Sequence, residues 1–218
     1  KTHPMPKSLG GTEFRKMIIS GAKVLEINRS KVDSLNVFPV PDGDTGTNMS
    51  LTIQSAVKEL SLCASNRLGE LCDAVSKGAL KGARGNSGVI LSQLFRGICA
   101  GIKNTDPITI KAFAKAMENG TKVAYSAVSK PKEGTILTVA KGASLKAREL
   151  ADAGETDLGK YLSEIIDHAD YVLSQTPEML PVLKQAGVVD SGGQGLMQVL
   201  KGAYEAFLGK EVAFTVED

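Results

Sequence analysis

Apolar residues recur at helical spacing in almost every segment of this chain, and no other feature limits its fold as much. In residues 12–29, for example, Phe14, Met17, Ile18 and Leu25 follow the three-to-four-residue spacing that places side chains on one helix face. The alternation of polar and apolar residues that marks a half-buried strand is almost absent. We therefore predict an all-α fold in which helices pack on one another as a bundle.

The spacing predicts eight or nine helices in a single compact domain, for which 218 residues are sufficient. Aromatic residues make up only 5% of the chain and Trp is absent, so aliphatic side chains must supply most of the core. The predicted helices cover residues 12–29, 48–60, 67–80, 89–103, 109–128, 131–150, 157–174, 177–185 and 196–208. Residues 211–218 alternate polar and apolar side chains, which indicates the start of an extended segment.

Four glycine-rich segments interrupt the helical pattern, at residues 30–47, 81–88, 131–137 and 187–195. Each combines Gly with Ser, Thr, Asn or Asp just before an apolar helix. The first turn of a helix has unpaired N–H groups and a partial positive charge, and glycine lets the backbone approach an anion closely. Helices that begin at several such segments can converge on one phosphate-rich ligand. For any single segment the alternative is an ordinary turn or cap, with Ser87 as an N-cap.

Asp42 and Asp44 flank a single glycine, and two carboxylates held this close repel each other unless a cation lies between them. Hard oxygen ligands favour Mg²⁺ or Ca²⁺. A calcium loop of the EF-hand type requires Asp or Asn, Gly and Glu at its fifth, sixth and twelfth positions, where this chain has Gly46, Thr47 and Ile53. The segment therefore predicts a magnesium site.

Charge and cysteine content exclude several other classes of protein. The net charge is only +2, and no basic block suggests nucleic-acid binding. The longest apolar runs are far shorter than the roughly 20 residues of a membrane span, and the first residues contain no apolar signal-peptide core. Cys63, Cys72 and Cys99 form no CxxC pair, as is typical of buried thiols in a reducing cytoplasm. We expect a cytoplasmic protein.

Four motifs in this order resemble the nucleotide-binding domain of bacterial fatty acid kinase, a member of the dihydroxyacetone kinase L-subunit superfamily. They occupy residues 36–49 (NVFPVPDGDTGTNM), 82–97 (beginning GARGNSG), 133–139 (EGTILTV) and 188–193 (VVDSGG). The resemblance covers residues 8–210. It implies a barrel of about eight antiparallel helices, with ATP bound at one end through Mg²⁺.

The resemblance also implies roles for individual residues. Asp42 and Asp44 become ligands of Mg²⁺, expected as two ions, and Asn36 occupies a position where members of the dihydroxyacetone type have a further aspartate. Arg84 is a candidate for stabilising phosphate charge, although a surface arginine is the equal alternative. The implied nucleotide contacts are Thr45, Thr47, Asn48, Met49, Asn86, Ser87, Gly88, Thr135, Ile136, Leu137, Asp190 and Gly192.

The residues around the two aspartates select a branch of the superfamily. Dihydroxyacetone kinases often have Gly-Asp-Gly-Asp-His-Gly, whereas this chain has Pro41 before the first aspartate and Thr45 after the second. The fatty acid kinase branch implies phosphoryl transfer from ATP to a fatty acid carboxylate, giving ADP and an acyl phosphate. Such a carboxylate is already ionised at neutral pH, and it needs no general base.

The fatty acid kinase branch also implies partners. The acyl chain is presented by a separate fatty-acid-binding protein, and the full-length protein is a homodimer. Residues 211–218 then begin a linker to domains that this chain lacks. Two alternatives stay open: a kinase for dihydroxyacetone or a similar small hydroxyketone, and a non-catalytic nucleotide-binding or regulatory module.

Overall fold

The computed structural model describes residues 6–210, which form ten helices and one isolated β-bridge between Leu9 and Ile108. The predicted all-α class is confirmed. The extended segment predicted at residues 211–218 lies outside the described residues. The helices are α1 (Gly11–Ile27), α2 (Arg29–Ser34), α3 (Thr45–Ser61), α4 (Leu68–Lys81), α5 (Gly85–Ile102), α6 (Ile110–Ser126), α7 (Ile136–Asp152), α8 (Leu158–Met179), α9 (Pro181–Ala186) and α10 (Ser191–Phe207).

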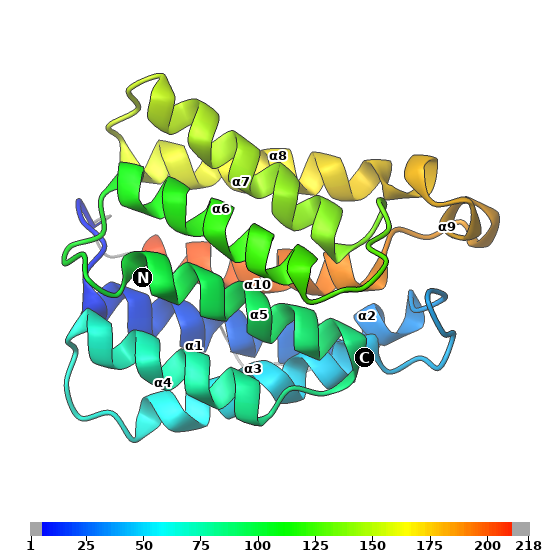
Figure 1. The fold of residues 1–218 in the computed structure, drawn as a ribbon, viewed down its shortest axis with the longest axis horizontal. Helices are drawn as coiled ribbons and strands as arrows, with labels where there is room; N and C mark the ends of the chain where they lie inside the picture. Colours follow the sequence, from blue (N-terminus) through cyan, green and yellow to red (C-terminus); the bar gives the residue numbers. More distant parts are fainter. Residues whose placement is uncertain (1–5, 211–218) are drawn as a thin grey trace.

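The eight longer helices form a closed barrel. Each packs against the next in the order α1, α3, α4, α5, α6, α7, α8 and α10, and α10 returns to α1. Successive helices run in opposite directions, so α3, α5, α7 and α10 all begin at the same end, next to the short helices α2 and α9 (Figure 1). The expected barrel of about eight antiparallel helices is therefore confirmed, and its topology gathers four helix N-termini.

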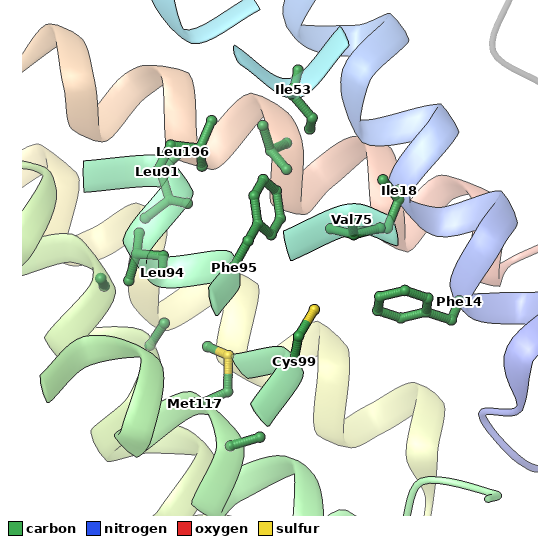
Figure 2. Close-up of a cluster of buried hydrophobic side chains, with 14 of the residues drawn as sticks. Phe14, Ile18, Ile53, Val75, Leu91, Leu94, Phe95, Cys99, Met117 and Leu196 are labelled. Carbon is green, nitrogen blue, oxygen red and sulfur yellow. The ribbon is translucent and has the colours of Figure 1, made fainter. Parts of the chain in front are cut away.

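The barrel closes around an aliphatic core. In α4, for example, the buried residues Leu68, Leu71, Cys72, Val75 and Ala79 lie on one face because their spacing matches the helical repeat. Figure 2 shows side chains from α1, α3, α4, α5, α6 and α10 meeting in this interior. Each fully buried Leu or Ile contributes about 1.5–3 kcal/mol to stability. Within residues 6–210, no helix combines the length and apolar character that crossing a membrane requires.

Three helices begin earlier than the sequence pattern indicates. Starts predicted at residues 48, 89 and 196 lie instead at Thr45, Gly85 and Ser191. The pattern places these glycines before the helices, but they belong to first turns that pack against neighbouring elements. A Cβ atom at Gly88, for example, would lie 2.4 Å from the Thr52 hydroxyl oxygen.

Several further boundaries differ from the prediction, and α7, for example, begins at Ile136 and not at residue 131. The helix predicted at residues 12–29 ends at Ile27. The short helix α2 is not predicted by apolar spacing, because Val32 is its one apolar residue. The break predicted before Pro177 is also wrong, since α8 continues to Met179. Proline cannot donate to the Leu173 carbonyl, but the Thr176 hydroxyl donates to that oxygen at 2.7 Å and keeps it satisfied.

Arg15 joins α1 to the end of α3 through hydrogen bonds from its guanidinium group. It donates to the carbonyls of Leu60, Cys63 and Ser65 at 2.7–3.0 Å and to the Asn66 side chain at 2.8 Å. We expect Arg15→Met to lower the free energy of unfolding by about 2–4 kcal/mol in urea denaturation, because it keeps the apolar stem but removes every donor.

Arg67 provides the matched control, because it is an exposed arginine near the same turn. Arg67→Met should change stability by less than about 0.5 kcal/mol. Equal losses in the two variants would contradict the role given to Arg15.

Candidate functional site

Two adjoining pockets form one cleft at the end of the barrel where α3, α5, α7 and α10 begin. Their volumes are about 410 and 380 Å³, and they share Pro39, Asn86, Ser87 and Val89. The larger pocket has mostly apolar walls that include Phe38, Ile90, Val128, Ile136 and Leu137. The smaller pocket contains Asn36, Asp42, Asp44, Thr45, Asn48 and Gly85.

Asp42 and Asp44, the predicted metal ligands, both line the smaller pocket. The pKa of the Asp44 carboxyl lies above its ordinary value of 3.8, chiefly because the Asp42 carboxyl lies within hydrogen-bonding distance; burial and charge repulsion add to the effect. Within residues 6–210 no group of three or more His, Cys, Asp or Glu side chains is arranged to hold a metal. A pair of carboxylates suits Mg²⁺, which commonly takes one or two from the protein and its other ligands from phosphate and water.

Asn36 holds the loop that carries the two aspartates. Its buried amide oxygen accepts from the N–H groups of Asp44 and Thr45 at 3.1 and 3.2 Å, and its amide nitrogen donates to the Val40 carbonyl at 3.1 Å. These bonds already occupy the oxygen that would ligate a metal. The geometry therefore favours a loop-holding role for Asn36 over the metal position that the resemblance implies.

At the start of α3, the N–H groups of Asp44, Thr45 and Thr47 are paired within the protein. Asn36 accepts from the first two, and Asp33 accepts from the N–H of Thr47 at 2.9 Å. Gly46, which lies between them, does not line either pocket. Thr47 therefore faces Asp33, and it does not line either pocket. Consequently α3 contributes carboxylates to the cleft in place of free N–H donors.

The first turn of α5 is different. In the described part of the chain, the N–H groups of Gly85, Asn86 and Ser87 have no acceptor, and all three residues line the smaller pocket. The buried Thr52 fixes this turn against α3, because its hydroxyl accepts from the Arg84 N–H at 3.2 Å and donates to the Asn48 carbonyl. The start of α5 therefore offers a prearranged set of donors for an anion.

Asp190 ties the starts of α7 and α10 together. One of its oxygens accepts from the Gly193 N–H at 2.8 Å, and its own N–H donates to the Thr176 hydroxyl at 3.1 Å. The Ile136 N–H at the start of α7 lies close enough to the carboxylate to favour its charged form. Ser191 then links α10 to α3 through a hydrogen bond to Thr45 at 3.2 Å. Among the described residues, the N–H groups of Ser191 and Gly192 have no acceptor, so α10 also presents donors to the larger pocket.

The turn before α7 depends on a network that sequence reasoning missed. The Thr138 hydroxyl accepts from the Gly134 N–H at 2.8 Å and donates to Glu133, and Glu133 also binds Lys141 and Tyr125 at 2.9 and 3.0 Å. The network holds the turn whose next three residues line the larger pocket. Those residues are Thr135, Ile136 and Leu137, which the resemblance names as nucleotide contacts.

Not every predicted residue reaches the cleft. Met49 is fully buried beneath it, close to Gly195, and Gly88 packs on Thr52. Arg84 is exposed and does not line either pocket. Asp33 and Thr52 are supporting residues that lie outside the motifs, and Glu133 is a motif residue to which the resemblance gives no role; only their contacts show what they do.

Asp190 makes the stability of the fold depend on pH. Burial raises its pKa from 3.8 to about 6, although the N–H groups of Gly193 and Ile136 oppose the shift. The folded chain therefore holds this proton more tightly than the unfolded chain does. The stabilisation of the fold by the protonated Asp190 carboxyl is fully present below pH 3.8 and is lost as the pH rises through about 6. The Asp190→Asn variant should gain about 2–3 kcal/mol relative to the unmodified chain between pH 4 and 7. Urea denaturation of the variant and the unmodified chain across this range measures the difference between their free energies of unfolding. A difference that does not change with pH would contradict the role given to Asp190.

Comparison with known families decides the classification. A profile described as the DAK2 domain matches residues 39–205. The chain belongs to the DAK2 domain family. This DAK2 domain is 50% identical over 206 residues to the protein YloV of Bacillus subtilis strain 168, and 51% identical over 208 residues to an uncharacterised protein of Staphylococcus aureus strain USA300. The two alignments cover 94% and 95% of this chain but only 37% and 38% of the two relatives. The chain therefore spans little more than a third of their length.

Two solved structures share the fold of this DAK2 domain. The dihydroxyacetone kinase from C. freundii, in complex with AMP-PNP and Mg²⁺, aligns with 88% of this chain and 33% of its own, at a TM-score of 0.65 and 18% identity. The native form of that kinase gives a TM-score of 0.61, with 34% of its own chain covered. The expected dihydroxyacetone kinase-like fold is thus confirmed.

Proposed function

We propose that this domain binds ATP and ADP with Mg²⁺ in the cleft and serves as the nucleotide-binding domain of a kinase. One observation carries the proposal: the carboxylates of Asp42 and Asp44 share a pocket with the free N–H donors at the start of α5. A metal site next to an anion site is the combination that a nucleotide phosphate chain requires. The AMP-PNP and Mg²⁺ held by the C. freundii kinase of the same fold support this proposal.

The phosphates are assigned to the starts of α5 and α10. The N-terminal ends of α5 and α10, which carry partial positive charge, border the cleft. Asn86, Ser87 and Gly192 have free N–H groups there, and Asn48 lies beside the start of α5. Asp42 and Asp44 would hold the metal, which we expect to be two Mg²⁺ ions, and the metal would neutralise phosphate charge. Asn36 keeps the metal loop in place.

The base is assigned to the larger pocket. Its volume of about 410 Å³ is within the ordinary range for small-molecule sites, and Val128, Ile136 and Leu137 give it apolar walls. The buried Asp190 beneath it keeps α7 and α10 together. These residues would bind and orient the nucleotide, which accounts for most of the catalysis in phosphoryl transfer.

We further propose that the acceptor is the carboxylate of a fatty acid delivered by a separate fatty-acid-binding protein. A carboxylate oxygen would attack the terminal phosphorus, and the bond from that phosphorus to the bridging oxygen would break, giving ADP and an acyl phosphate. The carboxylate has no proton to lose, so the step needs no base from the cleft. The family motifs at residues 36–49 and 82–97 support this acceptor.

The greater length of the relatives supports a division of labour in the whole protein. We propose that residues 8–210 form the nucleotide domain and that 211–218 begin the linker to domains that dock the partner and form a homodimer. ATP as donor and the free thiols of Cys63, Cys72 and Cys99 fit a cytoplasmic location. The shared fold with a dihydroxyacetone kinase favours a small hydroxyketone as the second candidate acceptor.

Two assays test these proposals. Calorimetric titration of the domain with ADP, with Mg²⁺ and then with a chelator, should show binding that weakens when Mg²⁺ is removed. The full-length protein supplied with radiolabelled ATP and Mg²⁺ should then label oleate in the presence of a fatty-acid-binding protein, but leave dihydroxyacetone unlabelled. Labelled dihydroxyacetone would select the second candidate, and nucleotide binding without labelling of either acceptor would select the regulatory module.

A further inference from the structure

The short helix α2 supports the metal loop from outside the cleft. The fully buried side chain of Val32 anchors α2, which packs against α3 and α10. Gly46 lets α2 lie directly on the first turn of α3, because a Cβ atom there would meet the Arg29 carbonyl oxygen at 2.4 Å and Val32 Cβ at 2.9 Å. The position of α2 therefore fixes where α3 begins.

Asp33 is the residue through which α2 holds that turn. Its two carboxylate oxygens are both engaged by Thr47: Oδ1 accepts from the backbone N–H at 2.9 Å, and Oδ2 accepts from the hydroxyl at 2.7 Å. A carboxylate that accepts two bonds from one residue restrains that residue in position and orientation. Thr47 lies three residues after Asp44 and next to Asn48, so the restraint extends to both pocket residues.

Asp33 also brings a third negative charge to the metal loop. It lies close enough to Asp44 for the two charges to repel, although its own oxygens are turned to Thr47. A carboxylate in this position attracts a cation without ligating it. Position and charge thus act in the same direction on cation binding.

We propose that Asp33 is a positioning residue for the metal site: it holds the first turn of α3 through Thr47 and raises the affinity of the Asp42–Asp44 pair for Mg²⁺. This inference rests on the proposed function, since it assumes that the pair binds Mg²⁺ with a nucleotide. It assigns no contact between Asp33 and the metal, the nucleotide or the acceptor.

Three variants separate position from charge. Asp33→Ala removes both, whereas Asp33→Asn removes the charge but can still accept from the Thr47 N–H and donate to its hydroxyl. Thr47→Val keeps the charge and the backbone bond but loses the hydroxyl bond. Glu13→Ala is the matched control, because Glu13 accepts from the Gly10 N–H at 2.8 Å at the opposite end of the barrel.

The measurement is the Mg²⁺ concentration that half-saturates binding of fluorescently labelled ADP to the whole chain, with affinity in chelator as the second readout. We expect this concentration to rise about tenfold or more in Asp33→Ala. It should rise about two- to fivefold in Asp33→Asn and in Thr47→Val. Affinity in chelator should stay within twofold of the unmodified chain in all of them, and Glu13→Ala should change neither readout.

An unchanged Mg²⁺ requirement in Asp33→Ala would overturn the inference, as would equal losses with and without Mg²⁺. If Asp33→Ala fails to fold, Asp33→Asn and Thr47→Val decide the question by the same criterion. Failure of the proposed function looks different, because the unmodified chain would then bind labelled ADP with no dependence on Mg²⁺.

Discussion

Asp42→Asn and Asp44→Asn are each expected to weaken Mg²⁺-dependent nucleotide binding by at least about a hundredfold. Each substitution keeps the shape of the side chain but removes one of the two charges that would hold the metal against the phosphates. Calorimetric titration with ADP in Mg²⁺ measures the loss. Circular dichroism should show unchanged helicity, because Asp42 lies in an exposed loop and Asp44 is the N-cap of α3, and neither belongs to the core.

Asp170→Asn is the control, because it removes one carboxylate at a position away from the cleft. Asp170 is exposed on α8, pairs with Lys201 at 3.2 Å and does not line the cleft. Its substitution should leave nucleotide affinity unchanged. Unaltered Mg²⁺-dependent affinity in both Asp42→Asn and Asp44→Asn would refute the metal assignment.

Gly85→Ala is expected to lower nucleotide affinity about tenfold to a hundredfold, through the start of α5. Gly85 has a φ angle of +66°, which strains any residue with a Cβ atom. That atom would also lie 2.5 Å from the Asn48 side-chain nitrogen, so Asn48 or the donor turn must move. The same titration measures the loss.

Gly154→Ala separates this effect from backbone strain. Gly154 has a φ angle of +84° in the loop between α7 and α8, and a Cβ atom there would meet nothing within 4 Å. Both variants should lose about 1–2 kcal/mol of stability from the positive φ, but only Gly85→Ala should lose affinity. Equal affinities would show that the start of α5 does not bind the phosphates.

Helical periodicity predicted an all-α bundle because the fold buries one face of each long helix, whereas the closed barrel was implied by the family resemblance. Leu68, Leu71 and Val75 show this, since their spacing alone identifies the buried side of α4. Periodicity could not find α2, which has a single buried anchor, and it could not place the start of α5, where glycine serves close packing. The extension of α8 through Pro177 depends on the Thr176 hydroxyl, a contact that residue propensities do not contain.

The motifs predicted most of the residues that line the cleft but not those that hold them in place. Asp42, Ser87 and Ile136 line the cleft, and each belongs to one of the glycine-rich segments that the sequence singles out. Asp33 and Thr52 act on Thr47 and Arg84, which are 14 and 32 positions away, so the partners are not evident without the fold. Asn36 shows a second limit of the motifs. Its position in the motif suggests a metal ligand, but only the fold shows that its side-chain oxygen already accepts two backbone hydrogen bonds.

The placement of a metal-bound nucleotide in the cleft can be tested by a crystal structure of this chain with ADP and Mn²⁺, recorded with anomalous scattering. We expect an anomalous peak between the carboxylates of Asp42 and Asp44, with the phosphates at the N–H groups of Asn86 and Ser87 and the base beside Ile136. A metal peak away from both aspartates, or a nucleotide outside the cleft, would contradict it.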